Sequence, residues 1–149
     1  MKNKGMTIIV KTITRITVWL ILVYGIYIIL HGHLTPGGGF PGGVIIALAF
    51  LNVLLAQGRE FTKNWLKMNL LHDLEATSAI LYLIVGILGI SFTGYFLSNF
   101  LPKGKLFNLI SAGTIPVLNI IIGLKVCAGL FFVLWSLAIF HLASKEEEK

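Results

Sequence analysis

Four long stretches of apolar residues most strongly constrain what this chain can fold into. They span residues 8–30, 40–56, 76–97 and 115–143. Their only charges are Lys11 and Arg15 near the start of the first stretch and Lys125 within the fourth. A helix needs roughly 20 apolar residues to cross the hydrocarbon core of a bilayer. Because only 12% of the 149 residues are charged, against about a quarter in soluble domains, the sequence predicts an all-α membrane protein with four transmembrane helices.

The lengths of these stretches refine the prediction. The second is short, so its helix is expected to begin within the preceding Gly-rich segment, and the fourth is long enough to tilt or to project from the membrane. The first is longer than the apolar region of a typical signal peptide and lacks a small-x-small cleavage site before His31. We therefore expect a retained helix there, and a single transmembrane domain over residues 1–149 with no internal repeat.

The placement of Lys and Arg predicts the orientation in the membrane, because cytoplasmic segments carry an excess of these residues. Nine lie in the N-terminal segment, the loop after the second stretch and the C-terminal tail: Lys2, Lys4, Lys11, Arg15, Arg59, Lys63, Lys67, Lys145 and Lys149. Only Lys103 and Lys105 lie in the other loops. We therefore expect both termini in the cytoplasm of a bacterial or archaeal cell. The net charge of +6 follows from this distribution and does not indicate nucleic-acid binding.

Residues 31–43, which read HGHLTPGGGFPGG, form an unusual Gly- and Pro-rich segment before the second stretch. Proline favours the first turn of a helix, so we expect a tight outer loop and a helix that starts near Pro41. Two interpretations stay open. Gly39, Gly43 and Ala47 are spaced four apart and could form a ridge for close helix packing. Alternatively, the bare amides or carbonyls could face an ion. The spacing favours packing.

The string from Gly32 to Gly43, GHLTPGGGFPGG, closely resembles the signature of the MnhB, or MrpB, family, the B subunit of multisubunit Na⁺/H⁺ antiporters. The stretch from Asn119 to Leu130, NIIIGLKVCAGL, is similar to the last helix of that family. Pro41 departs from the family pattern, which often has a polar residue there. The matching loop residues are Gly32, His33, Pro36, Gly37, Gly38, Gly39, Phe40, Gly42 and Gly43, and Asn119, Gly123 and Gly129 are assigned to helix packing.

The resemblance implies an accessory subunit of an ion-translocating complex, with other membrane subunits as partners and Na⁺ and H⁺ nearby. That complex could be a plain antiporter, or the ion-pumping module of an archaeal membrane-bound hydrogenase or sulfur reductase. The alternatives are a purely structural assembly subunit and a stand-alone small transporter. The stand-alone transporter is disfavoured because proton-coupled carriers usually use a carboxylate inside the membrane. We expect no carboxylate inside the predicted spans of this chain.

Lys125 is the only charge deep within an apolar stretch. It lies ten residues after Ile115, about 15 Å along a helix and near the middle of a roughly 30 Å core. A lysine at this depth costs at least ~2.5 kcal/mol on insertion scales, so it usually has a partner. We expect that partner in another subunit or in a polar cavity between subunits. Lys125 could form a structural ion pair with that partner, or it could act as an electrostatic element beside a cation path.

The remaining polar candidates lie near the membrane surfaces. Asp73 and Glu75 are expected in the first turn of the third helix, where carboxylates favour the helix dipole and Asp73 could act as N-cap. With His72 they could instead form an uptake point for cations. His31 and His33 lack the further ligands that a metal site needs. We find no catalytic constellation, so the sequence predicts a chain that is not itself an enzyme and has no cofactor or metal.

Overall fold

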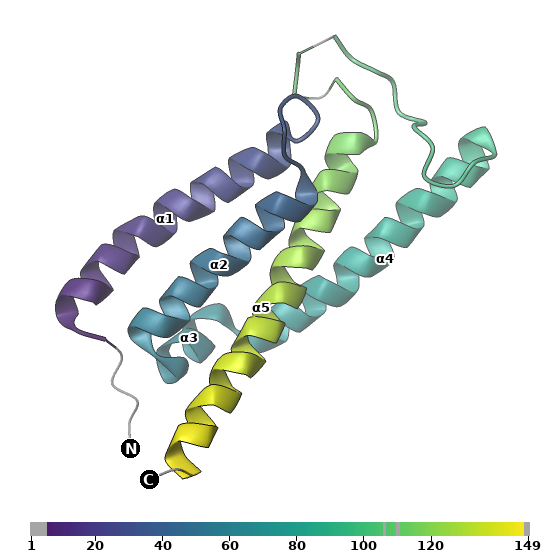
Figure 1. Ribbon diagram of the computed structural model, residues 1–149. Coiled ribbons are helices and arrows are strands. Elements are labelled where there is room, and N and C mark those ends of the chain that lie inside the picture. Colours follow the sequence, from purple (N-terminus) through teal and green to yellow (C-terminus); the bar gives the residue numbers. More distant parts are fainter. Residues whose placement is uncertain (1–5, 106, 110, 148–149) are drawn as a thin grey trace.

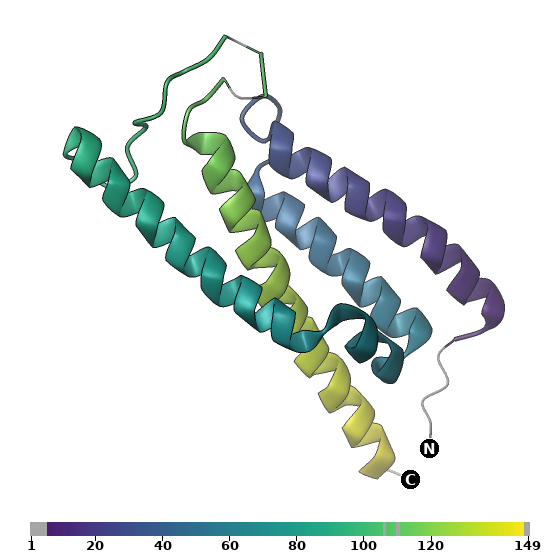
Figure 2. The same cartoon turned by 180° about the vertical axis from the view of Figure 1, so that it is seen from behind.

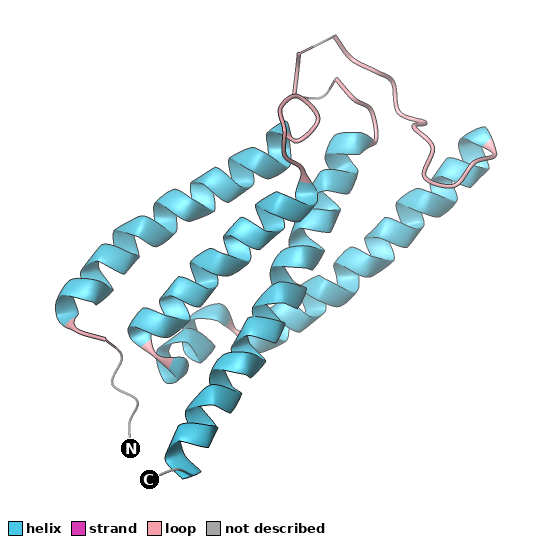
Figure 3. Ribbon diagram, viewed as in Figure 1, coloured by secondary structure: helices cyan, strands magenta, loops and turns pink. Residues whose placement is uncertain are grey.

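The computed structural model describes residues 6–105, 107–109 and 111–147. Within these residues the chain is built from helices and loops, without strands (Figure 3). The helices are α1 (Ile8–His31), α2 (Gly39–Gln57), α3 (Arg59–Leu66), α4 (Met68–Thr93) and α5 (Ile115–Glu147). Four of them contain segments long and apolar enough to cross a membrane: Ile8–His31, Gly39–Gln57, Met68–Thr93 and Ile115–Phe140. The prediction of an all-α membrane protein with four spans is confirmed.

The four long helices run between two ends of the molecule (Figure 1). The start of α1, the end of α5 and the short helix α3 lie at one end, and the described parts of the loops 32–38 and 94–114 lie at the other. At the end that holds the termini, the backbone N–H of Met6 donates a 2.9 Å hydrogen bond to the carbonyl of Ala56. The start of α1 and the end of α2 are therefore tied together at the same level.

Helix α2 is the centre of the bundle. It lies between α1 and α5 and packs on both, as the two opposite views show (Figures 1 and 2). Its buried residues point both ways: Ala49 packs with Val18 of α1, and Ala47 packs with Phe131 of α5. In its membrane span 44% of the residues are buried, against 17% for α1 and for α4. Most of the surface left for lipid or other proteins therefore belongs to the outer helices.

Helix α4 departs from its predicted bounds of 76–97. It begins at Met68 and ends at Thr93, where Gly94 adopts a positive φ of 82° and donates its N–H to the carbonyl of Ile90. Glycine in this left-handed conformation is a common helix terminator. The start was misplaced because the helix also includes residues 68–75, whose helix formers are one methionine, three leucines and one glutamate.

Helix α3 was not predicted, because its eight residues are largely polar. Gly58, with a φ of 91°, separates it from α2, and Lys67, with a φ of 40°, separates it from α4. Thr62 points inward and is fully buried, whereas Phe61 and Trp65 are partly exposed. A short amphipathic helix of this kind, at the end of a bundle of spans, is suited to the membrane–water interface.

Candidate functional site

The Gly-rich segment places the start of α2 against α5. The backbone N–H groups of Leu34 and Thr35 both donate to the carbonyl of His31, which reverses the chain after α1. Gly38 precedes α2 with a φ of 136°, a conformation that residues with side chains rarely adopt. The N–H of Gly39 then donates to Oδ1 of Asn119 on α5 at 3.4 Å. An asparagine of the last helix therefore accepts one of the unpaired donors at the start of the second.

Gly39, Gly43 and Ala47 are all buried and lie on the side of α2 that packs on α5. A Cβ at Gly39 would collide with the backbone carbonyl of Asn119, and one at Gly43 would lie 2.6 Å from the carbonyl oxygen of Gly123. Real Cβ atoms essentially never approach a backbone atom so closely. The two helix backbones are therefore in direct contact, which is the geometry that small residues at four-residue spacing allow.

Other residues of the motif serve different contacts. A Cβ at Gly42 would lie 2.9 Å from the carbonyl of Gly25 on α1, so α2 approaches both neighbours through glycines. His33 lies 3.3 Å through Nε2 from the carbonyl of Asn108 in the 94–114 loop. Phe40 is exposed and points away from the bundle. Three further motif residues lie in the exposed part of the loop or beside its turn: Gly32, Pro36 and Gly37.

The histidines at the end of α1 and in the following loop, His31 and His33, have different partners. His31 stacks on the ring of Tyr27 at 4.1 Å and lies 3.1 Å through Nδ1 from the Tyr27 carbonyl. His33 contacts the other loop instead. In the described part of the chain no three His, Cys, Asp or Glu residues gather where they could hold a metal ion.

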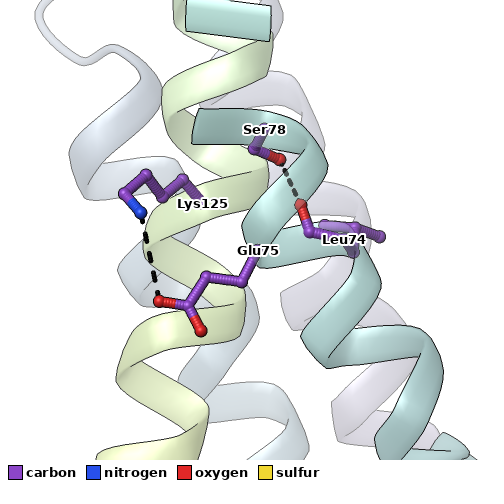
Figure 4. Close-up of polar contacts among 4 residues, drawn as sticks. All are labelled: Leu74, Glu75, Ser78 and Lys125. Carbon is purple, nitrogen blue, oxygen red and sulfur yellow. Dashed lines mark hydrogen bonds and ion pairs between the residues drawn. The ribbon is translucent and has the colours of Figure 1, made fainter. Parts of the chain in front are cut away.

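The second feature is an ion pair between α4 and α5. Nζ of Lys125 lies 4.0 Å from Oε1 of Glu75 (Figure 4). The two side chains are 50% and 36% exposed in the isolated chain. A Cβ at Gly129, one turn after Lys125, would lie 3.5 Å from the same carboxylate oxygen, so the small residue leaves room for Glu75 against α5. The pair is long, and one side of it is open.

This pair corrects two predictions. The expected partner of Lys125 in another subunit or in a cavity is, in the structure, Glu75 of the same chain. Glu75 also does not open its helix, because α4 begins at Met68 and Glu75 therefore lies about 10 Å into it. Asp73 is not an N-cap for the same reason, and it is exposed. The argument that the chain lacks a carboxylate inside a span is therefore wrong.

Further residues line the α4–α5 contact around the pair. The imidazole of His72 stacks on the ring of Phe132 at 4.0 Å, so His72 and Glu75, three residues apart, face α5 together. Ser78, one turn further, is buried and donates its hydroxyl to the carbonyl of Leu74 at 2.6 Å (Figure 4). Of the four polar candidates, the structure brings Lys125, Glu75 and His72 to one contact and leaves Asp73 outside it.

Two features of the site were missed from the sequence. The ion pair was missed because the start of α4 was placed eight residues too late, and the three leucines and the glutamate before Ala76 were the available signal. The bond from Gly39 to Asn119 was missed, because the sequence assigned Asn119 to helix packing without identifying its partner.

Four apolar spans and a backbone contact through glycines define a polytopic membrane protein of the kind found in helical membrane complexes. The chain matches the family described as "Domain related to MnhB subunit of Na+/H+ antiporter" over residues 9–132. It belongs to this family, and the predicted resemblance is confirmed.

Individual relatives agree with this assignment. An uncharacterized protein of Methanocaldococcus jannaschii is 42% identical over 87% of this chain and 53% of its own length. A putative antiporter subunit mnhB2 of Staphylococcus aureus is 32% identical over 75% of this chain and 72% of its own. A chain of the membrane-bound sulfane sulfur reductase, an archaeal respiratory membrane complex, superposes with a TM-score of 0.69 at 34% identity. That match covers 87% of this chain and 56% of the other. The chain thus spans about half the length of the archaeal relatives that it matches.

Proposed function

We propose that this chain is a non-catalytic accessory subunit of a multisubunit Na⁺/H⁺ antiporter module in the cell membrane. The module is either a stand-alone antiporter or the ion-pumping part of a respiratory complex such as a hydrogenase or sulfur reductase. Within it, Glu75 and Lys125 act as an electrostatic element beside a cation path. Membership of the MnhB family and the likeness to a chain of an archaeal respiratory complex support the role as a subunit.

The observation that carries the electrostatic role is the half-exposed ion pair between two membrane spans. Charged side chains in a span almost always face protein or a water-filled cavity, because lipid cannot solvate them. The open side of the pair therefore needs a polar cover, which a neighbouring subunit or water between subunits would supply. A cation that passes there comes close to both charges and interacts with each of them. Lys125 repels Na⁺, so Glu75 is the side chain that would attract it.

The test is Na⁺-dependent pH change in vesicles that contain the whole complex with Lys125→Met, which keeps the apolar stem and removes the charge. Transport or its coupling should fall while assembly, checked on a native gel, survives. Lys63→Met, on the exposed face of α3, is the matched control and should transport like wild type. Wild-type transport by an assembled Lys125→Met complex would leave the purely structural alternative. Transport by the purified chain alone would instead support a stand-alone carrier.

We also propose that both termini are cytoplasmic and that the 32–38 loop faces outward. The motive is the excess of Lys and Arg at the end of the molecule that holds the termini and α3. Single cysteines are introduced at Thr35 and at Lys63 in a Cys127→Ala background. A membrane-impermeant maleimide should label position 35 in intact cells and position 63 only after lysis. The opposite pattern would reverse the topology.

A further inference from the structure

A hollow lies between α1, α2 and α3 at the end of the bundle that holds the termini. Its volume is about 260 Å³. It is lined by Thr14, Arg15, Val18, Trp19, Val53, Gln57, Phe61 and Trp65. Neither the glycine contact nor the Glu75–Lys125 pair takes part in it. We propose that this hollow binds one anionic phospholipid, with its phosphate on Arg15 and an acyl chain along the apolar wall.

The lining changes from polar to apolar along the membrane normal, as a lipid does. Gln57 is the last residue of α2, at the level where Met6 bonds to Ala56, and Arg15 lies about 10 Å into α1 from the same end. Val18 and Val53 follow deeper in the bundle and are buried against each other. The polar part of the lining therefore lies between the end of the bundle and the level of Arg15, and the apolar wall that follows suits a hydrocarbon chain.

The charge of the hollow selects an anion. Arg15 is exposed and has no acidic partner within 4 Å among the described residues, whose ion pair is Lys125–Glu75. A guanidinium holds phosphate through two parallel hydrogen bonds. Thr14, beside it, makes no side-chain hydrogen bond within the described chain, whereas Thr12 and Thr17 donate to carbonyls one turn earlier. The groups that face the hollow are thus the ones left available to a ligand.

Two tryptophans mark the hollow as a site for lipid. Trp19 and Trp65 line it from α1 and α3, and both side chains are exposed in part in the chain. Tryptophan rings are enriched at the level of the headgroups because one edge is polar and the body is apolar. Basic pockets between membrane helices at this level are known to take phospholipid headgroups.

The same tryptophans report on occupancy. The full chain with Trp135→Phe is reconstituted in vesicles that contain a few per cent of lipid with brominated chains, either phosphatidylglycerol or phosphatidylcholine. Bromine quenches a tryptophan that it touches. We expect brominated phosphatidylglycerol to quench with about fivefold higher apparent affinity, the effect of one basic side chain near an anionic lipid. Arg15→Gln should abolish this preference. Lys11→Gln, one turn earlier and outside the lining, should keep it.

Equal quenching by the two lipids in wild type, or an equal loss of preference in both variants, would overturn the proposal. Cross-linking in native membranes provides a test that does not depend on the folding of the variants. A photoreactive benzophenone side chain at Phe61 should yield mainly a phospholipid adduct. A predominant adduct to another membrane protein would show that a subunit fills the hollow, and the proposal would fail.

Discussion

Helix α5 contacts α2 and α4 through different kinds of groups. At α2 the approach is between backbones, through Gly39 and Gly43, with fully buried neighbours. At α4 the approach is between long polar side chains, Glu75 and Lys125, which are 4.0 Å apart and partly exposed. Helix α4 also diverges from α5 toward the end that holds the loops (Figures 1 and 2).

The difference separates a structural contact from a functional one. Backbone contact through small residues gains dispersion energy and lacks room for an ion or for water. A partly open ion pair contributes little to stability, because exposed pairs are typically worth 0 to about 1 kcal/mol, yet it sets the local potential. We therefore expect the α2–α5 contact to hold the fold and the α4–α5 contact to interact with neighbours and ions.

The largest effect is expected from Gly43→Leu. A leucine side chain would have to displace the carbonyl of Gly123, which is part of a helix backbone and cannot yield. Overpacking typically costs about 1–3 kcal/mol and occasionally more. Because the obstacle here is backbone, α2 and α5 should separate and the subunit should be lost from its complex on a native gel. Ala76→Leu, the same enlargement at an exposed position of α4, should be tolerated. An intact complex with Gly43→Leu would refute close packing here.

A smaller loss is expected from Asn119→Ala. It removes the acceptor of the Gly39 N–H at the start of α2, and one such hydrogen bond contributes about 1 kcal/mol. The thermal midpoint of the purified complex should fall by a few degrees, as measured by tryptophan fluorescence. Asn52→Ala is the matched control, because Asn52 is exposed on α2 and its side chain makes no hydrogen bond among the described residues. Equal shifts for the two variants would mean that the bond does not stabilise the junction.

The smallest effect on stability is expected from Glu75→Gln. It keeps the shape of the side chain and removes the charge that faces Lys125. Because both side chains are partly exposed, the free energy of unfolding should change by no more than about 1 kcal/mol. Denaturation in graded detergent and urea should therefore match wild type closely. A loss as large as that of Gly43→Leu would make the pair a structural element and remove the contrast between the two contacts.

The part of the fold that follows from span length was predictable, and the part that depends on crossing helices was not. Apolar length alone placed α1 and α2 within one residue of their observed bounds. It misplaced the start of α4, because the helix also includes the less apolar residues 68–75.

The candidate site likewise has one part that the sequence predicted and one part that it did not. The four-residue spacing of Gly39, Gly43 and Ala47 predicted a packing face, but spacing carries no information about which helix lies opposite. The meeting of Glu75 with Lys125 depends on where α4 crosses α5, and residues 50 positions apart in sequence offer no local pattern for it.

The measurement that tests the central claim most directly is a charge exchange across the α4–α5 contact. Complexes with Lys125→Glu, with Glu75→Lys and with both changes are assembled in vesicles, and Na⁺-dependent pH change is recorded beside a native gel. Each single change places two like charges opposite each other across the contact and should abolish transport. The double exchange should restore part of it, and all three complexes should assemble. Transport that is equally low in the double and the single variants, or unchanged in all three, would contradict a role for the pair in ion movement.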